Sequence, residues 1–247
     1  MERIIHYCWF GGKPIPQKLL EYQETWRRFF PDYELQRWDE SNFDIRCCRY
    51  VSEAYDAGKW AFVSDYCRFW ALEKYGGLYF DTDVEIVRPF DELLELNGFT
   101  GFETENDVNP GLVLYLKEPH NEIFRKTIEW YEEHPFLDDH GERIRINVCG
   151  IFTGILRQYG FEPNGRLQEC GGITVFPKDY FCPFDDTTGL LHKTQNTYTI
   201  HWYDKSWFSP SMRFRSRITR IFHRWFGVDC FAPFKTKGNG SFLGRNS

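Results

Sequence analysis

The chain has 247 residues and a formal net charge of −6, and aromatic residues make up 19% of it. This length favours one main domain with a sizeable core. The acidic balance argues against nucleic acid as a partner. No stretch approaches the roughly 20 consecutive apolar residues of a membrane-spanning helix, and the N-terminus lacks the pattern of a signal peptide. We therefore expect a cytoplasmic protein.

The cysteines form no CxxC pair and show no spacing typical of a zinc site. Their even number is compatible with disulfides, but scattered cysteines in a chain of this size favour buried thiols in a reducing compartment. The eight positions are Cys8, Cys47, Cys48, Cys67, Cys149, Cys170, Cys182 and Cys230.

Apolar patterning predicts strands that alternate with helices along the chain. The predicted strands are 3–10, 33–38, 78–80, 171–177 and 197–202. The predicted helices are 15–30, 50–58, 59–77, 121–134 and 146–160, with a helical turn at 89–98. This alternation indicates an α/β chain with a mainly parallel sheet.

Two aspartates follow the strand predicted at 78–80, in GGLYFDTDVEIV. On an extended strand, Asp81 and Asp83 would point to the same side. Two carboxylates on one side repel each other unless a cation lies between them, and a hard divalent cation prefers such oxygen ligands. A DxD motif by itself is also common in turns, so both interpretations stay open.

The helix before this strand carries Asp65 and Arg68, which share one helix face at a spacing of three. Their aromatic surroundings favour a charged pair at a cleft, while a solvated ion pair remains the alternative. His6 lies inside the first predicted strand, where a hydrogen-bonded core histidine is favoured over a ligand.

Together, SDYCRFW (64–70) and GGLYFDTD (76–83) form the pattern SDxxR…GGxYxDxD. This pattern resembles the signature of glycosyltransferase family 32, the DxD type of sugar transferase associated with capsular polysaccharide synthesis. It also resembles the catalytic domains of the large glucosylating bacterial toxins. The similarity extends to IIHYCWFGGKPIP near the N-terminus and to HWYDKSW (201–207), is loose over 100–195 and is absent after 210.

The resemblance implies a GT-A fold, with a Rossmann-like, mainly parallel sheet flanked by helices. It implies a metal-dependent hexosyltransferase that retains the anomeric configuration and uses Mn²⁺ or Mg²⁺. The donor would be a nucleotide sugar, UDP-linked, carrying a hexose or an N-acetylhexosamine. The acceptor would be a saccharide or a lipid-linked molecule in the synthesis of a bacterial surface polysaccharide, such as a capsule or lipopolysaccharide.

The same resemblance implies roles for residues that bind the donor. Trp9 would stack on the uracil, and Tyr79 would line the donor pocket. Asp65 and Arg68 would bind the hydroxyl groups of the donor sugar. An arginine fork and a flat indole face suit these partners.

The remaining implied roles concern the metal and the diphosphate. Asp81 would contact the ribose and the metal, and Asp83 would be the firm metal ligand. His201 would complete the metal or diphosphate shell, although the toxins have no histidine there. Ser206 and Trp207 would lie against the β-phosphate. The residues expected to carry catalysis are Asp65, Arg68, Asp81 and Asp83.

No catalytic base stands out from the sequence. Candidates to contact the acceptor are Glu103, Glu105, Asp107 and Asn147. For the acidic stretch GFETENDVNPG, a solvated loop is an interpretation at least as favoured.

The C-terminal segment 211–227, SMRFRSRITRIFHRWFG, has five arginines and no acidic residue, with apolar residues at near-helical spacing. We expect a catalytic domain over 1–210, a basic amphipathic helix over 211–235 and disorder over 236–247. Such a helix suits the anionic inner face of the cell membrane. A helix packed on an acidic body is the equal alternative.

Two other functions stay open. One is a catalytically idle subunit that binds nucleotide sugars or serves as a scaffold in polysaccharide assembly. The intact DxD and SDxxR motifs argue against it, because an idle subunit has no need of them. The other is a glycosidase, whose two carboxyl groups flank the sugar about 5–9.5 Å apart. Carboxylates at i and i+2 fit a shared ion better.

Overall fold

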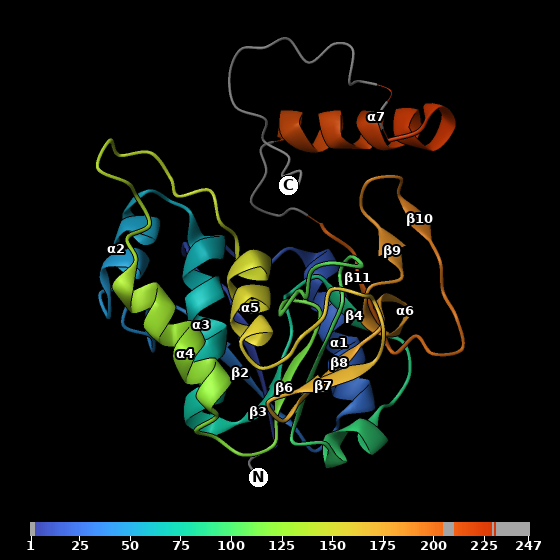
Figure 1. Ribbon diagram of the computed structural model, residues 1–247. Helices are drawn as coiled ribbons and strands as arrows, with labels where there is room; N and C mark the ends of the chain where they lie inside the picture. The colour runs from blue at the N-terminus through green and yellow to red at the C-terminus, as the bar shows by residue number, and fades with distance from the viewer. Residues whose placement is uncertain (1–2, 205–209, 229, 231–247) are drawn as a thin grey trace. The chain divides into compact units, whose positions relative to one another are not determined.

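The computed structural model describes residues 3–204, 210–228 and 230, and Figure 1 shows its helices and strands. The chain forms two compact units. The first comprises residues 1–184 and 192–204, and the second comprises residues 185–191 and 205–247. The tail predicted to be disordered, 236–247, lies outside the described residues.

Among the described residues, the first unit contains a seven-stranded sheet with the order β2-β1-β3-β6-β5-β8-β7. β6 pairs antiparallel with β3 and β5, and β7 pairs antiparallel with β8, so five strands share one direction. The predicted mainly parallel α/β sheet is therefore confirmed. The strands are β1 Ile4–Cys8, β2 Glu34–Trp38, β3 Gly77–Tyr79, β5 Gly98–Gly101, β6 Leu114–Leu116, β7 Gln168–Cys170 and β8 Ile173–Phe176.

Helices cover both faces of this sheet. Figure 1 shows α2 to α5 together on one side of the sheet and α1 on the other. A second, two-stranded sheet pairs β4 with β11. The bounds are α1 Gln17–Phe29, α2 Arg49–Asp56, α3 Trp60–Tyr75, β4 Val84–Ile86, the 3₁₀ helix η1 Asp91–Glu95, α4 Glu122–Glu133, α5 Val148–Arg157, α6 Lys178–Phe181 and β11 Thr199–His201.

Side chains of β3 alternate between two apolar clusters. Leu78 belongs to the cluster that contains Trp26 of α1, whereas Tyr79 belongs to the cluster that contains Phe69 of α3. A strand buried on both faces needs apolar residues at every position. This requirement explains the continuous apolar run that precedes the DxD motif.

Two glycines lead the chain from α3 into β3. Gly76 and Gly77 have φ of +67° and +94°, which few residues other than glycine adopt readily. A Cβ on Gly77 would lie 2.7 Å from the carbonyl oxygen of Ile4 in β1. The absence of a side chain therefore lets β3 approach β1 closely and fixes where the DxD motif begins.

The small β4–β11 sheet is part of the first unit and is held by α1. The indole N–H of Trp26 donates to the carbonyl oxygen of Val84 at 2.7 Å, and the N–H of Ile86 donates to the hydroxyl of Thr25 at 3.0 Å. Val84 is paired with His201 across the sheet. α1 thereby holds β4, the strand that pairs with β11, which carries His201.

The second unit contains a short hairpin and α7, Pro210–Phe226. The hairpin strands are β9 Phe184–Asp185 and β10 Leu190–Leu191, and the first residue of β9 belongs to the first unit. Arg220 of α7 forms an ion pair with Asp186 of the hairpin. Among the described residues, no helix combines the length and apolarity needed to cross a membrane.

No two of the eight cysteines are joined by a disulfide, and five of them are buried among the described residues. His6 is a core residue as predicted: it is fully buried, and its two ring nitrogens pair with the carbonyl oxygen of Gly76 and the indole N–H of Trp38.

Candidate active site

The candidate site lies where parallel strands of the large sheet end. The register aligns His6 of β1 with Tyr79 of β3, so both strands end at the same edge. Asp81 follows Tyr79 by two residues. Glu103 follows the end of β5, which runs in the same direction. Open α/β sheets bind ligands at this edge.

Asp81, Asp83 and His201 come together at this edge, although His201 is distant in the sequence. One ligand atom from each residue lies within 4.8 Å of the others. The expectation that the two aspartates share one side of an extended strand is wrong. The N–H of Val84 donates to the carbonyl oxygen of Asp81 at 3.1 Å, so the motif forms a turn between β3 and β4.

His201 is held by a carboxylate. Its Nε2–H donates to Oδ1 of Asp83 at 2.9 Å, and the residue is only 6% exposed. Burial by itself would lower the pKa of His201, but the negative charges of Asp83, Asp81 and Glu103 raise it to about 9. The raised pKa shows that this edge has a strong negative potential.

Asp83 is bonded through both carboxylate oxygens. Its Oδ2 accepts the N–H of Asp204 at 2.8 Å, while Oδ1 accepts from His201. Burial alone would raise the pKa of Asp83, yet the positive imidazolium and the backbone N–H groups hold it below its ordinary value. Asp83 is therefore ionised and fixed in place.

Asp65 and Arg68 of α3 form a buried pair, which rules out the solvated ion pair. They are 8% and 3% exposed, and Nη2 of Arg68 donates to Oδ1 of Asp65 at 2.7 Å. The same Nη2 lies 3.3 Å from Oδ1 of Asp81, and the guanidinium stacks 4.9 Å from the ring centre of Tyr79. Arg68 thus links the helix to the DxD motif.

The pKa of Asp65 is raised to about 7, because burial, together with the neighbouring Asp81, raises it more than Arg68 lowers it. The other guanidinium nitrogen, Nη1 of Arg68, is buried and has no hydrogen-bond partner among the described residues. A buried donor without a partner is costly, so this atom is available to a ligand oxygen.

Gly111 allows the backbone to approach this cluster. A Cβ at Gly111 would lie 2.1 Å from Oδ2 of Asp81 and 3.0 Å from Nη1 of Arg68. Asn109 fixes the loop, because its side-chain oxygen accepts the N–H of Gly111 at 2.7 Å. The sequence interpretation did not identify either residue, since the contact with Asp81 is visible only in three dimensions.

Glu103, a predicted acceptor contact, lies beside the site and is held by two hydrogen bonds. Its Oε1 accepts the hydroxyl of Tyr203 at 2.5 Å and the amide of Asn109 at 3.1 Å. The ring of Tyr203 packs 4.1 Å from that of His201, at a backbone φ of +49°. Tyr203 was not predicted as a site residue, although it belongs to the HWYDKSW motif.

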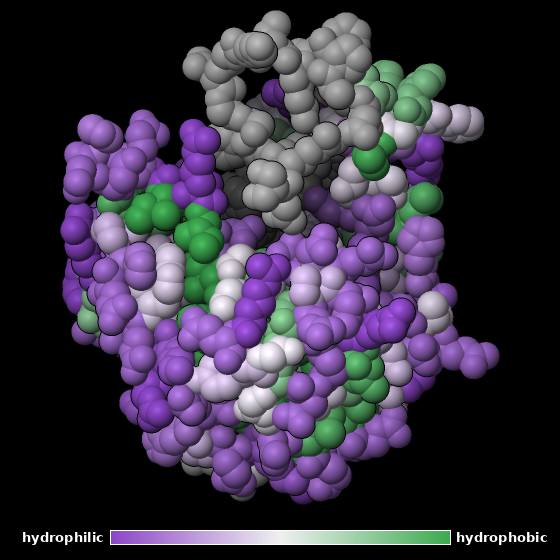
Figure 2. Space-filling view, in the orientation of Figure 1, coloured by the Kyte–Doolittle hydropathy of each residue, from purple (hydrophilic) through white to green (hydrophobic). Residues whose placement is uncertain are grey.

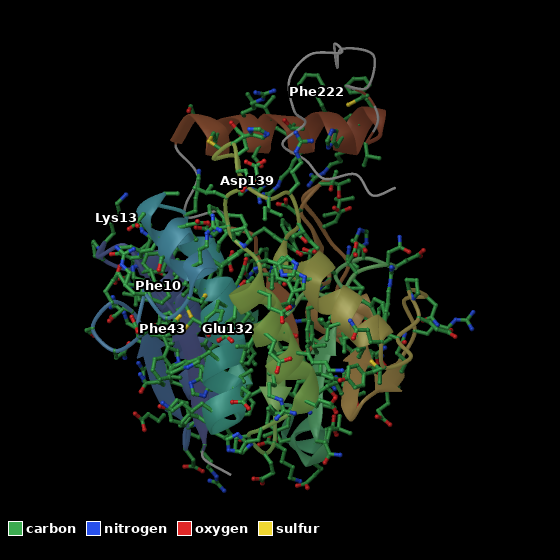
Figure 3. All side chains as sticks on the ribbon, turned by 60° about the vertical axis from the view of Figure 1, so that its left-hand side comes forward. Phe10, Lys13, Phe43, Glu132, Asp139 and Phe222 are labelled. Carbon is green, nitrogen blue, oxygen red and sulfur yellow. The ribbon has the colours of Figure 1, made fainter. Side chains whose placement is uncertain are left out.

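The residues predicted to bind the base and the β-phosphate are Trp9, Ser206 and Trp207. Trp9 directly follows β1 at the same sheet edge, is partly exposed and donates its indole N–H to the carbonyl oxygen of Lys13 at 2.6 Å. Its neighbour Phe10 packs against Phe43, with ring centres 5.7 Å apart (Figure 3). Ser206 and Trp207 lie outside the described residues.

The remaining acceptor candidates do not converge with Glu103. Glu105 is exposed, and the carbonyl oxygen of Asp107 accepts the N–H of Glu103 at 2.9 Å within the loop. Asn147 is the N-cap of α5, where its side chain accepts the N–H of Gly150 at 2.9 Å. This helix-capping contact gives Asn147 a structural role.

The donor set at the edge fits a divalent cation. Two carboxylates and one imidazole are common ligands of Mn²⁺ and related ions. Nδ1 of His201 is buried and has no hydrogen-bond partner in the part of the chain that the structure describes. In the imidazolium this nitrogen carries a proton, and a bound cation would take the place of that proton.

Residues 16–100 match the family model described as a glycosyltransferase sugar-binding region containing a DXD motif. This segment contains α3, β3 and both aspartates of the motif. A relative in Schizosaccharomyces pombe, inositol phosphoceramide mannosyltransferase 3, is 35% identical over 100 residues. That match covers 37% of this chain and 27% of the relative's length. The chain thus contains a DXD-type sugar-binding region.

Two solved structures share the fold. The PaToxG glycosyltransferase has a TM-score of 0.51 at 18% identity, with 64% of this chain and 68% of that chain covered. The galactosyltransferase LgtC, solved with donor and acceptor sugar analogues, has a TM-score of 0.50 at 12% identity, with 87% and 93% covered. The fold is that of GT-A glycosyltransferases.

Proposed function

We propose that this protein is a retaining, metal-dependent glycosyltransferase related to family 32. It transfers a hexose or N-acetylhexosamine from a UDP-sugar to a saccharide or lipid-linked acceptor in surface polysaccharide synthesis. The observation that supports this most is the convergence of Asp81, Asp83 and His201 within 4.8 Å at the edge of a GT-A sheet. In the same region, Arg68 connects Asp65 to Asp81.

In this proposal Asp81, Asp83 and His201 hold Mn²⁺ or Mg²⁺. A bound divalent cation would neutralise the negative charge that develops on the departing diphosphate. Asp83 suits a firm ligand because its pKa is low and its position is fixed by Asp204. Glu103 supports Tyr203, which packs against the ring of His201 and limits its movement.

Arg68, Asp65 and Tyr79 form the donor-sugar side of the proposed site. The free Nη1 of Arg68 offers a donor to a sugar hydroxyl, and Asp65 offers an acceptor. Trp9 would hold the base from the neighbouring strand end, where its indole is partly exposed. The absence of a side chain at Gly111 leaves room beside Asp81 and Arg68.

The relatives support the general class of donor and acceptor. The fungal relative is, by its name, a mannosyltransferase for inositol phosphoceramide, a lipid, and this supports a lipid-linked acceptor. LgtC was solved with donor and acceptor sugar analogues. The test must therefore include both UDP- and GDP-linked sugars.

The experiment measures nucleotide release from a panel of UDP- and GDP-sugars by the purified chain, with Mn²⁺, with Mg²⁺ and after chelation. We expect slow, metal-dependent hydrolysis of a UDP-sugar, and faster turnover once an acceptor is added. Binding of the nucleotide sugar without turnover would instead indicate an idle subunit. Metal-independent cleavage of glycosides would indicate a glycosidase.

A further inference from the structure

The second unit exposes an unusual amount of apolar side chain. Twelve large hydrophobic side chains are exposed among the described residues, and nine of them belong to this small unit. Single exposed apolar residues are common, but a concentration of them marks an interaction surface. The nine are Leu190, Leu191, Met212, Ile218, Ile221, Phe222, Trp225, Phe226 and Val228.

One face of α7 is bound to the hairpin of its own unit. Arg220 pairs with Asp186, and Nη2 of Arg224 donates to the carbonyl oxygen of Gly189 at 3.0 Å. Nδ1 of His223 lies 3.3 Å from the carbonyl oxygen of Thr187. Residues 220, 223 and 224 are separated by three and four positions, so they form one stripe along the helix.

A second stripe lies opposite the first and carries apolar side chains. Ile218, Ile221 and Trp225 are also spaced by three and four positions, and they are 39%, 58% and 77% exposed. Phe226 beside them is 71% exposed. Figure 2 shows green, hydrophobic side chains on α7, and Figure 3 labels Phe222 on this helix. We call Ile218, Ile221, Trp225 and Phe226 the outer face of α7.

The charge of α7 differs from that of the whole chain. The chain has a net charge of −6, whereas segment 210–226 contains five arginines and no aspartate or glutamate. Arg215 is exposed on this helix. A helix with a basic flank and an aromatic outer face has the pattern of helices that lie in the surface of an anionic bilayer.

We propose that the outer face of α7 docks on an anionic membrane surface, with Arg215 at the headgroups. This inference goes beyond the proposed transferase activity and does not depend on it. A second copy of the chain is a poorer partner, because a two-fold interface would bring this face against itself and place arginine near arginine. Bilayer headgroups carry the opposite charge.

The test is co-sedimentation of the full chain with vesicles of phosphatidylcholine, with and without about 30% phosphatidylserine. We expect binding to the anionic vesicles at about 50 mM salt and its loss at about 500 mM, because surface charges are screened. Trp225→Ser should weaken binding at least about tenfold. Leu167→Ser, an equally drastic change at an exposed apolar residue of the first unit, should not.

A second pair of variants tests how much the positive charge of α7 contributes to vesicle binding. Arg215→Gln should weaken binding about fivefold, the scale expected for one arginine near an anionic surface. Arg28→Gln, at an exposed arginine of α1, should leave vesicle binding unchanged. Nucleotide release from free donor should be the same in Trp225→Ser and in the original chain. Vesicle binding is measured separately from nucleotide release, and a failure of the transferase proposal would therefore leave this test unaffected.

Three outcomes would overturn the inference. The first is no binding to anionic vesicles at low salt, and the second is equal binding by Trp225→Ser and the original chain. The third is a change of oligomeric state in Trp225→Ser without any vesicle binding, which would assign the outer face to self-association. Circular dichroism that is unchanged in the variants would exclude loss of the helix as the cause.

Discussion

His6 and His201 are both buried in the first unit, yet their surroundings hold the two imidazoles in opposite charge states. His6 lies inside β1, where Trp38 and the carbonyl oxygen of Gly76 are its hydrogen-bond partners. Burial lowers the pKa of His6 to about 4, and the hydrogen bond to Gly76 only partly opposes this. His6 is therefore neutral near pH 7.

His201 lies at the edge of the sheet and is charged. Burial disfavours its charge as well, but nearby carboxylates outweigh this effect and raise the pKa to about 9. The comparison teaches that burial does not decide the role of an ionisable residue here. Three acidic side chains around one point, Asp81, Asp83 and Glu103, distinguish the proposed cation site from the core.

The largest expected effect comes from Asp83→Asn, which keeps the shape of the side chain and removes its charge. Nucleotide release from the donor should fall by about 100- to 1,000-fold, the scale seen when one electrostatic stabiliser is removed. Binding of Mn²⁺, measured by electron paramagnetic resonance, should weaken as well. Asp32→Asn, at an exposed aspartate paired with Arg3, should change neither. Full activity in Asp83→Asn would disprove the proposed metal site.

The next effect concerns His6 and the stability of the core. Its folded-state pKa of about 4 lies below the ordinary 6.5, so between these pH values the unfolded chain binds more protons. The stability from neutral His6 is therefore complete above pH 6.5 and decreases as the pH falls toward 4, by about 3 kcal/mol. In denaturant titrations over this pH range, the free energy of unfolding of His6→Gln should therefore fall by about 3 kcal/mol less than that of the original chain. An unchanged pH dependence would refute the buried neutral state, and His192→Gln, at an exposed histidine, is the control.

A smaller effect is expected for Trp9, the partly exposed counterpart of the buried Trp38. If Trp9 stacks on the base, Trp9→Ala should weaken UDP binding by about 1–3 kcal/mol, the range for aromatic stacking on single-stranded nucleic acids. Calorimetry measures this change directly. Trp225→Ala, at an exposed tryptophan of α7, is the matched control. An unchanged affinity in Trp9→Ala would exclude the stacking role.

The smallest effect is expected for Tyr203→Phe, which removes only the hydroxyl that bonds to Glu103. Groups that orient metal ligands typically change metal affinity by 10- to 100-fold, so we expect about tenfold weaker binding of Mn²⁺. Tyr115→Phe loses a hydroxyl bond to Leu94, in a different part of the sheet, and should leave Mn²⁺ binding unchanged. If both variants bind Mn²⁺ as the original chain does, Tyr203 does not position His201.

Much of the central architecture could be predicted because its elements are long and apolar. The helices near 15–30 and 59–77 and the strands near 3–10 and 33–38 correspond to α1, α3, β1 and β2. β6 and β7 have three residues each and were not predicted, because so short a run shows no period. Their pairing depends on distant partners.

The site was predicted in part. Asp81, Asp83 and His201 converge as the resemblance implied, and Asp65 pairs with Arg68. The predicted local geometry of the DxD motif was wrong, because the motif lies in a turn and not on an extended strand.

Other contacts at the edge could not be predicted. Glu103 bonds to Tyr203, 100 positions further along the chain, and Gly111 lies against Asp81 through the fold of its loop. No spacing rule connects such positions, since the contacts depend on how β5, β6 and β11 are arranged.

The pairing of β4 with β11 has a consequence for the biosynthesis of the protein. His201 lies 118 positions after its partner Asp83, so a ribosome that adds about 5–20 residues each second completes the cluster roughly ten seconds after the acidic pair has been made. Until then, the nascent chain carries two carboxylates without their histidine. A fragment limited to the matched segment 16–100 would keep the whole DxD motif and still lack the third member of the cluster.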